Sequence, residues 1–332
     1  MCNRTSTVLC NVIVMAAFVF ALCSASFAQS TDAQFQQDLD LANSGDVNAQ
    51  LRVGLAYNRG LVTKGNYREA MRWFQAAAEN GSNEAQAWVG SMYLLGHGAA
   101  QDLAEAYAIE SALAAQNVPT AQTFLGLMYY TGQGVPKDVH KAANLFRSAQ
   151  ETGDARAMDL LGVLYQRGEG VPHDNTIAEY FYSHAAARGD DWAETHLGDL
   201  YLKGLLGHPD YAAALANFTS AAQQNNFAAE QRLGLMYEKG KGMSPDDAEA
   251  VKWYTKSAVR GYSAAQLSLS RMYERGRGVP RDLVQAYAWT LIAQKNNHPL
   301  AATRLEKLRR SMTDEEVQRA TAVAKTLTKS AN

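Results

Sequence analysis

Residues 121–138 read AQTFLGLMYYTGQGVPKD, and this pattern returns every 36 residues along most of the chain of 332 residues. The tyrosine of the pattern belongs to a series with that spacing: Tyr57, Tyr93, Tyr129, Tyr165, Tyr201, Tyr237 and Tyr273. A strict period of this size is typical of repeat arrays, in which each unit buries its apolar face only against its neighbours. The sequence therefore predicts a scaffold built from seven similar units.

The first half of each unit has the apolar spacing of an amphipathic helix, which we name helix A. A small residue interrupts its interior in every unit: Gly54, Gly90, Gly126, Gly162, Gly198, Gly234 and Ser270. A glycine inside a helix costs about 1 kcal/mol relative to alanine. Because this cost recurs in register, the pattern predicts that a neighbouring helix approaches helix A closely at this point.

A second helix, which we name helix B, follows in each unit after a glycine that ends helix A and a short loop. The loop ends in a residue able to cap the next helix: Asn66, Asp102, Asp138, Asp174, Asp210, Asp246 or Asp282. Helix B then carries an alanine in register, followed three or four residues later by bulky side chains such as Phe146 and Trp253. Gly or Asn follows helix B, as expected where the backbone adopts positive φ. The fold class predicted is all-α, a solenoid of helix-turn-helix units.

The pattern A-x-x-x-L-G-x-x-Y-x-x-G-x-G-V-x-x-D-x-x-x-A-x-x-W/F resembles the Sel1-like repeat, a relative of the tetratricopeptide repeat. The resemblance covers seven consecutive units over residues 49–300 and implies a right-handed α-solenoid. Two units depart from it. The fifth reads KGLLGHPD at 203–210 and the first RGLVTKGN at 59–66, so we expect the loop between helices A and B to be reshaped in both.

The terminal segments of the sequence predict export and a repeat array that is capped by additional helices at both ends. Residues 1–28 read as a secretory signal peptide, with Arg4 before an apolar stretch and cleavage expected after Ala28. An uncleaved membrane anchor and lipidation at Cys23 remain alternatives. Residues 29–48 are expected to form an N-terminal capping helix, and residues 301–332 C-terminal capping helices that include a capping box at 313–316.

Composition narrows the classes of function. All three cysteines lie within residues 1–28, so no disulfide is expected after cleavage. The chain has 31 basic and 33 acidic residues, a formal net charge of −2, which gives little support to nucleic-acid binding. No apolar run of membrane-spanning length follows residue 28. We therefore expect a periplasmic or secreted bacterial protein, monomeric and without stable membrane insertion.

No catalytic, cofactor or metal site is predicted. The seven histidines are scattered without metal-ligand spacing, and His173, His184 and His196 lie on different elements. The G-x-G-V loops follow helices rather than strands and lack the lysine–serine pair of a phosphate-binding loop. The sequence thus predicts that the protein is not an enzyme.

A partner-binding face is predicted on helix A, because tetratricopeptide relatives bind ligands with these side chains. Counted from the mid-helix glycine, the positions at −3, +1, +4 and +5 vary between units while the packing positions repeat. Trp192 is added as an exposed anchor, although a role in filling a gap between repeats is equally open. The candidate partner-binding residues are Thr123, Leu127, Tyr130, Asp159, Gln166, Arg167, Trp192, Thr195, Asp199, Lys203, Glu238 and Arg271.

Three functions follow, in order of preference. The first is an exported scaffold or adaptor that binds a protein or peptide partner on the concave helix-A face. The second, a module that binds cell-wall glycan or peptide, requires Trp88, Tyr130 and Trp192 to be exposed together. The third, a hydrolase, requires a pocket with a buried, paired carboxylate or histidine.

Overall fold

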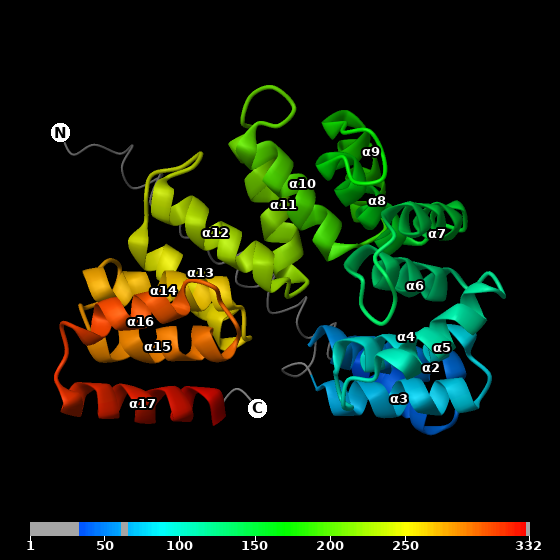
Figure 1. Cartoon of the computed structure of the whole chain (residues 1–332), viewed down its shortest axis with the longest axis horizontal. Coiled ribbons are helices and arrows are strands. Elements are labelled where there is room, and N and C mark those ends of the chain that lie inside the picture. The colour runs from blue at the N-terminus through cyan, green and yellow to red at the C-terminus, as the bar shows by residue number, and fades with distance from the viewer. Residues whose placement is uncertain (1–32, 61–65, 330–332) are drawn as a thin grey trace, which may run out of the picture. The chain divides into compact units, whose positions relative to one another are not determined.

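The computed structural model describes residues 33–60 and 66–329, so the signal segment and Cys23 lie outside the described residues. The chain divides into two compact units, Met1–Ala106 and Tyr107–Asn332. Every regular element in the described ranges is a helix (Figure 1). No helix in those ranges is both long and apolar enough to cross a membrane.

Unit 1 contains a helix at 33–43 followed by α2 (Val47–Arg59), α3 (Tyr67–Glu79) and α4 (Asn83–Leu95). The boundary between the units falls within α5 (Leu103–Ala114). Unit 2 continues with α6 (Pro119–Thr131), α7 (Val139–Glu151), α8 (Ala155–Arg167), α9 (Asn175–Ala186), α10 (Asp191–Lys203), α11 (Tyr211–Gln223), α12 (Phe227–Lys239), α13 (Asp247–Val259), α14 (Ser263–Arg275), α15 (Leu283–Lys295), α16 (Ala301–Arg309) and α17 (Asp314–Lys329). Even-numbered helices from α2 to α16 are helices A, and odd-numbered helices from α3 to α15 are helices B.

The hairpin between helices A and B is built as the sequence predicts. In the third repeat Gly132 ends α6 with φ of 77°, and Asp138 accepts hydrogen bonds from the amides of His140 and Lys141. The amide of Asp138 donates to the carbonyl of Tyr129 at 2.9 Å, which closes the loop, and every repeat has the equivalent bond. In the fifth repeat the loop is reshaped as expected, with Gly207 at φ of 127°.

The mid-helix glycine faces an aromatic ring of helix B in the same repeat. A Cβ on Gly198 would lie 2.6 Å from the Phe218 ring, and Gly54, Gly126, Gly162 and Gly234 meet Phe or Tyr rings equally closely. The predicted close approach is therefore confirmed, but a side chain makes it rather than the backbone of a neighbouring helix. In the seventh repeat Ser270 instead forms a 2.7 Å hydrogen bond with Thr290.

The second repeat has a carboxyl group at the position where most other repeats have the aromatic ring. The residue four positions after the helix-B alanine is Phe74, Glu110, Phe146, Tyr182, Phe218, Tyr254 or Thr290. Glu110 is 0% exposed, and neither of its carboxylate oxygens has a hydrogen-bond partner among the residues that the structure describes. Burial raises the pKa of Glu110 to about 10, so the buried carboxyl is protonated at neutral pH.

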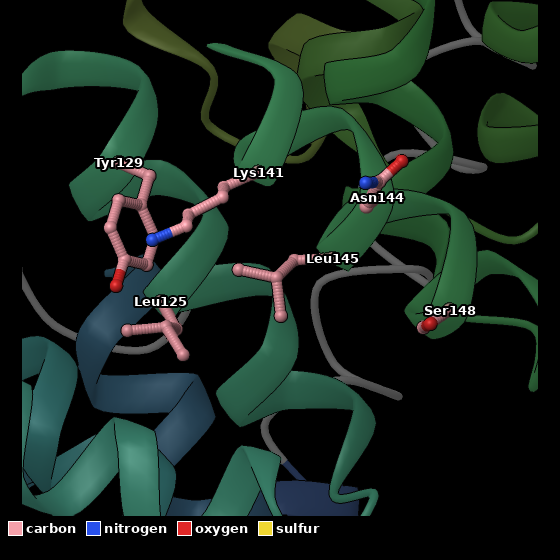
Figure 2. Close-up of a pocket in the computed structure, with 6 residues that line it drawn as sticks. All are labelled: Leu125, Tyr129, Lys141, Asn144, Leu145 and Ser148. Carbon is pink, nitrogen blue, oxygen red and sulfur yellow. The ribbon is translucent and has the colours of Figure 1, made fainter. Parts of the chain in front are cut away.

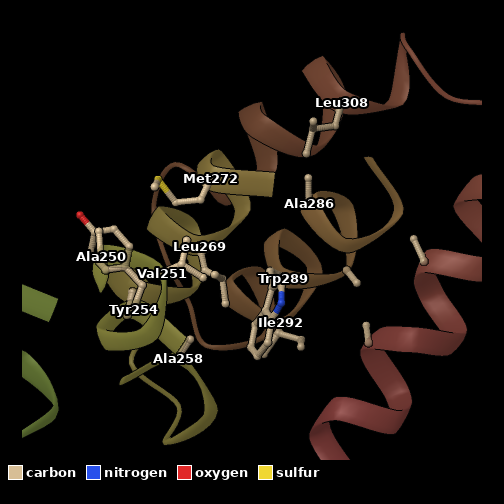
Figure 3. Packing of buried hydrophobic residues seen from close by; sticks show 14 of the residues in the cluster. Ala250, Val251, Tyr254, Ala258, Leu269, Met272, Ala286, Trp289, Ile292 and Leu308 are labelled. Atoms are coloured by element: carbon tan, nitrogen blue, oxygen red, sulfur yellow. The ribbon is translucent and has the colours of Figure 1, made fainter. Parts of the chain in front are cut away.

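Additional helices pack against both the first and the last helical hairpins of the array. Near the N-terminus, Phe35 and Leu39 pack with Val53 and Trp73, and Arg52 pairs with Asp38 at 2.7 Å. In unit 2, α15 packs against both α16 and α17, and the apolar cluster in Figure 3 includes Trp289 and Leu308. The predicted capping box opens α17, since the amide of Thr313 donates to Glu316 and the amide of Glu316 to Thr313 Oγ1.

Candidate partner-binding face

The predicted partner-binding residues of unit 2 divide by exposure. Thr123, Asp159, Thr195, Asp199 and Glu238 are buried. Leu127, Tyr130, Gln166, Trp192 and Arg271 are half-buried, whereas Arg167 and Lys203 are exposed. Most of the polar members bond to a neighbouring repeat or to helix B of their own repeat, so they also hold the array together.

Asp159 is the centre of the link between α8 and α10. Its carboxylate lies 2.6 Å from Nδ1 of His196 and 3.4 Å from Nη1 of Arg156. Arg156 also reaches Asp190, the N-cap of α10, at 3.5 Å. Burial raises the pKa of Asp190 to about 6, although the guanidinium of Arg156 opposes this change. A single arginine and a histidine thus hold two carboxylates between consecutive repeats.

A similar link joins α10 to α12. Arg232 donates from Nε to Asp199 at 2.7 Å and from Nη2 to the other carboxylate oxygen at 3.1 Å, a two-point contact with fixed geometry. Lys203 lies 3.5 Å from the same carboxylate. Asp199 was predicted to face a partner, and in this structure Arg232 and Lys203 surround it.

Glu238 links α12 to the loop that follows α14. It accepts hydrogen bonds from Lys239 at 2.9 Å and from the hydroxyl of the buried Tyr254 at 2.8 Å, and Arg277 lies 3.4 Å away. Burial works to raise the pKa of Glu238, but the bonds from Lys239 and Tyr254 outweigh it and lower the pKa. The carboxylate is therefore held in its charged form.

The uncharged candidates are also bonded. Thr123 donates to Asp154 at 3.2 Å, and Gln166 accepts from Tyr182 at 2.8 Å. Tyr130 accepts a 2.8 Å hydrogen bond from Arg167 of the next repeat. This last contact is exposed and lies at the ends of α6 and α8, so both side chains remain accessible from outside.

Trp192 belongs to a column of rings between repeats. Its ring lies 5.4 Å from Phe227 in an edge-to-face contact, and Phe227 lies 5.0 Å from Tyr262. The guanidinium of Arg156 lies over the Trp192 ring, 5.5 Å from its centroid. Interplanar angles of 80° and 39° mean that the rings pack against one another rather than forming one flat platform.

Three positions that link the repeats were not predicted from the sequence: Arg156, His196 and Arg232. They lie two or six residues before the mid-helix glycine, whereas the predicted face was restricted to −3, +1, +4 and +5. Positions at −6, −2, +1 and +5 are three or four residues apart and therefore share one side of a helix. This geometric rule could have found them.

A pocket of about 310 Å³ opens between α6 and α7 (Figure 2). Its lining consists of Leu125, Tyr129, Lys141, Asn144, Leu145 and Ser148. Leu145 lies three residues after the helix-B alanine, where other repeats have the larger Phe181, Trp253 and Trp289. The smaller side chain leaves space at this position. Lys141 lies over the Tyr129 ring at 5.0 Å.

The hydrogen-bonded Asp159 and His196 are the arrangement closest to an acid–base pair. Catalysis also needs a reactive group within reach of the base. No serine, threonine or cysteine side chain hydrogen-bonds to His196 in the part of the chain that the structure describes. Across residues 33–60 and 66–329, no group of three His, Cys, Asp or Glu side chains is arranged to hold a metal ion.

Comparison with known proteins places the chain among repeat proteins. The family model described as Sel1 repeat matches residues 47–82, 83–108, 119–151, 155–190, 193–226, 228–262 and 263–298. A solved Sel1 repeat protein from Oxalobacter formigenes is 31% identical, over 85% of this chain and 81% of that chain, with a TM-score of 0.55. A search of curated proteins found no match.

Two further solved structures match with lower TM-scores. The protein c5321, a protective antigen of uropathogenic Escherichia coli, is 24% identical over 88% of this chain and 94% of that chain, with a TM-score of 0.36. A putative Sel1 repeat protein from Klebsiella pneumoniae is 20% identical over 61% and 99%, with a TM-score of 0.46. From the seven matched repeats and the Oxalobacter structure, the chain belongs to the Sel1 repeat family.

Proposed function

We propose that this protein is an exported, non-catalytic scaffold that binds a protein partner through the helix-A face of repeats three to seven. The observation that carries the proposal is that the packing positions recur from repeat to repeat while the surface positions vary. The mid-helix glycine and its ring recur, while accessible positions change from Thr131 to Arg167 to Lys203. A repeating frame with a varied surface is suited to specific recognition.

Export is part of this proposal and rests on the sequence of residues 1–28. We expect the protein recovered from the periplasm or medium to begin at Gln29. N-terminal sequencing and intact mass measure this directly. A chain that retains Met1 would contradict cleavage, and a lipid adduct on Cys23 would replace it with the lipoprotein alternative.

The binding face is tested by blocking it at uncharged positions. In a full chain with Cys2, Cys10 and Cys23 changed to serine, single cysteines are placed at Thr131 or Leu235 on helices A and coupled to a bulky maleimide. Ser148 and Ala216 on helices B serve as matched controls, since both are exposed. The readout is capture of partner proteins from exported fractions.

We expect the label at Thr131 or Leu235 to abolish capture and the label at Ser148 or Ala216 to leave it intact. Loss of capture only with the helix-B labels would move the interface to the opposite helices. The glycan alternative receives no support from the ring column at Trp192, whose rings are not coplanar.

A further inference from the structure

One side of the helices A in unit 2 carries an excess of basic residues that the net charge of the chain conceals. We define the helix-A stripe as positions −6, −2, +1 and +5 from the mid-helix residue in α8, α10, α12 and α14, continued into α16 with the same period. Its bases are Arg156, Arg167, Lys203, Arg232, Lys239, Arg271, Arg275, Arg304 and Lys307, and its one acid is Asp199. The whole chain nevertheless has a formal net charge of −2.

Most of the acids that pair with this stripe are more buried than their basic partners. Asp159 is 1% exposed and its partner Arg156 39%, while Glu238 is 5% exposed and its partner Lys239 51%. Glu274 and Lys307 follow the same order at 17% and 70%, whereas Arg304 is as buried as Glu274. Most pairs are therefore dipoles whose positive end faces solvent. Including Asp159, Asp190, Glu238 and Glu274, and Glu169 beside Arg167, nine bases still face six acids.

Four exposed members form a row, with one cation per repeat. Arg167, Lys203, Lys239 and Arg275 are the last residues of α8, α10, α12 and α14, and all four are exposed. Cations at helix C-termini are favoured by the helix dipole. The helix dipole alone does not explain the row, because the equivalent helices α4 and α6 end at the uncharged residues Leu95 and Thr131.

We propose that this row binds an acidic, extended segment of a protein partner, with carboxylates about three residues apart. This inference rests on the proposed function and names the partner's chemistry. Helices in contact lie about 8–10 Å apart, and α8 and α10 contact directly. An extended chain in the polyproline II conformation advances about 3.1 Å per residue with three residues per turn, so every third side chain faces the row and meets the next cation.

A nucleic acid fits the row less well than an acidic peptide. One strand of a duplex carries a phosphate about every 3.4 Å, so a row spaced by about 8–10 Å would neutralise only about one phosphate in three. Six acids also lie within, beneath or beside the helix-A stripe and repel a dense polyanion. Carboxylates on every third residue of a peptide match both the spacing of the row and the modest excess of positive charge on the helix-A stripe.

The test titrates the full-length protein with the fluorescein-labelled peptide EGSEGSEGSE. The variant R167Q/K203Q/K239Q removes three cations of the row. The matched control R147Q/K252Q/K295Q removes three exposed cations from the helices B α7, α13 and α15. Circular dichroism establishes that both variants fold, and EEEEGSGSGS serves as a peptide of equal charge with the wrong spacing.

We expect the row variant to weaken EGSEGSEGSE binding about tenfold, from three exposed charge pairs at a few tenths to 1 kcal/mol each. The control variant should bind within about twofold of the native protein, and EEEEGSGSGS should bind more weakly. Binding should fade as salt is raised from about 20 to about 500 mM, because exposed charges are screened.

Equal losses in the two variants, equal binding of the two peptides, or tighter binding of single-stranded DNA than of the peptide would each overturn the inference. Absence of peptide binding at low salt would overturn it as well. The proposed function is tested separately, because the labels at Thr131 and Leu235 remove no charge. A partner captured on the helix-A face but unaffected by R167Q/K203Q/K239Q would refute the inference alone.

Discussion

The glycine within each helix A and the ring that faces it form a contact that is fixed by both residues. Gly162 meets Tyr182 and Gly198 meets Phe218, while Ser270 meets the smaller Thr290. The sequence register predicted the need for a small residue. It did not identify the ring, because bulky residues occur both three and four positions after the helix-B alanine, and only the fourth faces the glycine.

Gly198→Ala tests this contact. A helix gains about 1 kcal/mol when glycine becomes alanine, but the new methyl group would lie 2.6 Å from the Phe218 ring. Because overpacking costs about 1–3 kcal/mol, we expect a net loss of about 1 kcal/mol in the free energy of unfolding by urea. Ser148→Ala, on an exposed helix surface, should be neutral or slightly stabilising. A gain in stability with Gly198→Ala would show that the ring moves aside without cost.

Glu110 occupies a position held by an aromatic ring in five other repeats, and replacing it should stabilise the protein. Its pKa is about 10 in the folded state and about 4.3 in an unfolded chain. Between these values the folded state binds a proton that the unfolded state lacks, so stability falls as pH rises. We expect Glu110→Leu to be more stable than the native protein, with a difference that is larger at pH 8 than at pH 5.

Thermal unfolding at the two pH values measures this difference, and Glu105→Leu, an exposed position on the same helix, is the control. A difference between native protein and Glu110→Leu that does not change with pH would mean that the carboxyl is charged in the folded state.

The caps of the helices could be predicted from sequence, whereas the contacts between helices could not. A cap such as Asp174 acts on the amides of Thr176 and Ile177, so a short segment contains the whole interaction. The pair formed by Asp199 and Arg232 joins residues 33 positions apart and depends on the direction of both side chains. The repeat period predicts that α10 and α12 are neighbours but not which side chains meet.

The link between α10 and α12 is tested by a double-mutant cycle with Asp199→Asn and Arg232→Gln. Because Arg232 makes a two-point contact with Asp199, we expect a coupling free energy of about 0.5–2 kcal/mol in urea unfolding. The pair Lys252 and Glu249, at an exposed surface, provides a reference for which we expect weaker coupling. Additive effects at Asp199 and Arg232 would show that the contact does not stabilise the array.

For the whole molecule, the sequence predicts the architecture better than the surface chemistry. The all-α class, the seven repeats and their family are confirmed. The distribution of charge could not be predicted from the sequence. A net charge of −2 does not reveal that acids such as Asp159 lie beneath bases such as Arg156. The segment that carries the predicted signal peptide lies outside the described residues, so export stays a prediction.

Site-specific photo-crosslinking in the producing cell tests most directly whether the helix-A face binds a partner. A photoreactive phenylalanine at Leu235, on α12, is compared with one at Ala216, on α11. We predict a discrete protein adduct from Leu235 and none from Ala216, and the adduct should disappear when excess unlabelled protein competes. An adduct from Ala216 alone would contradict the account, and so would the absence of an adduct from every helix-A position tested.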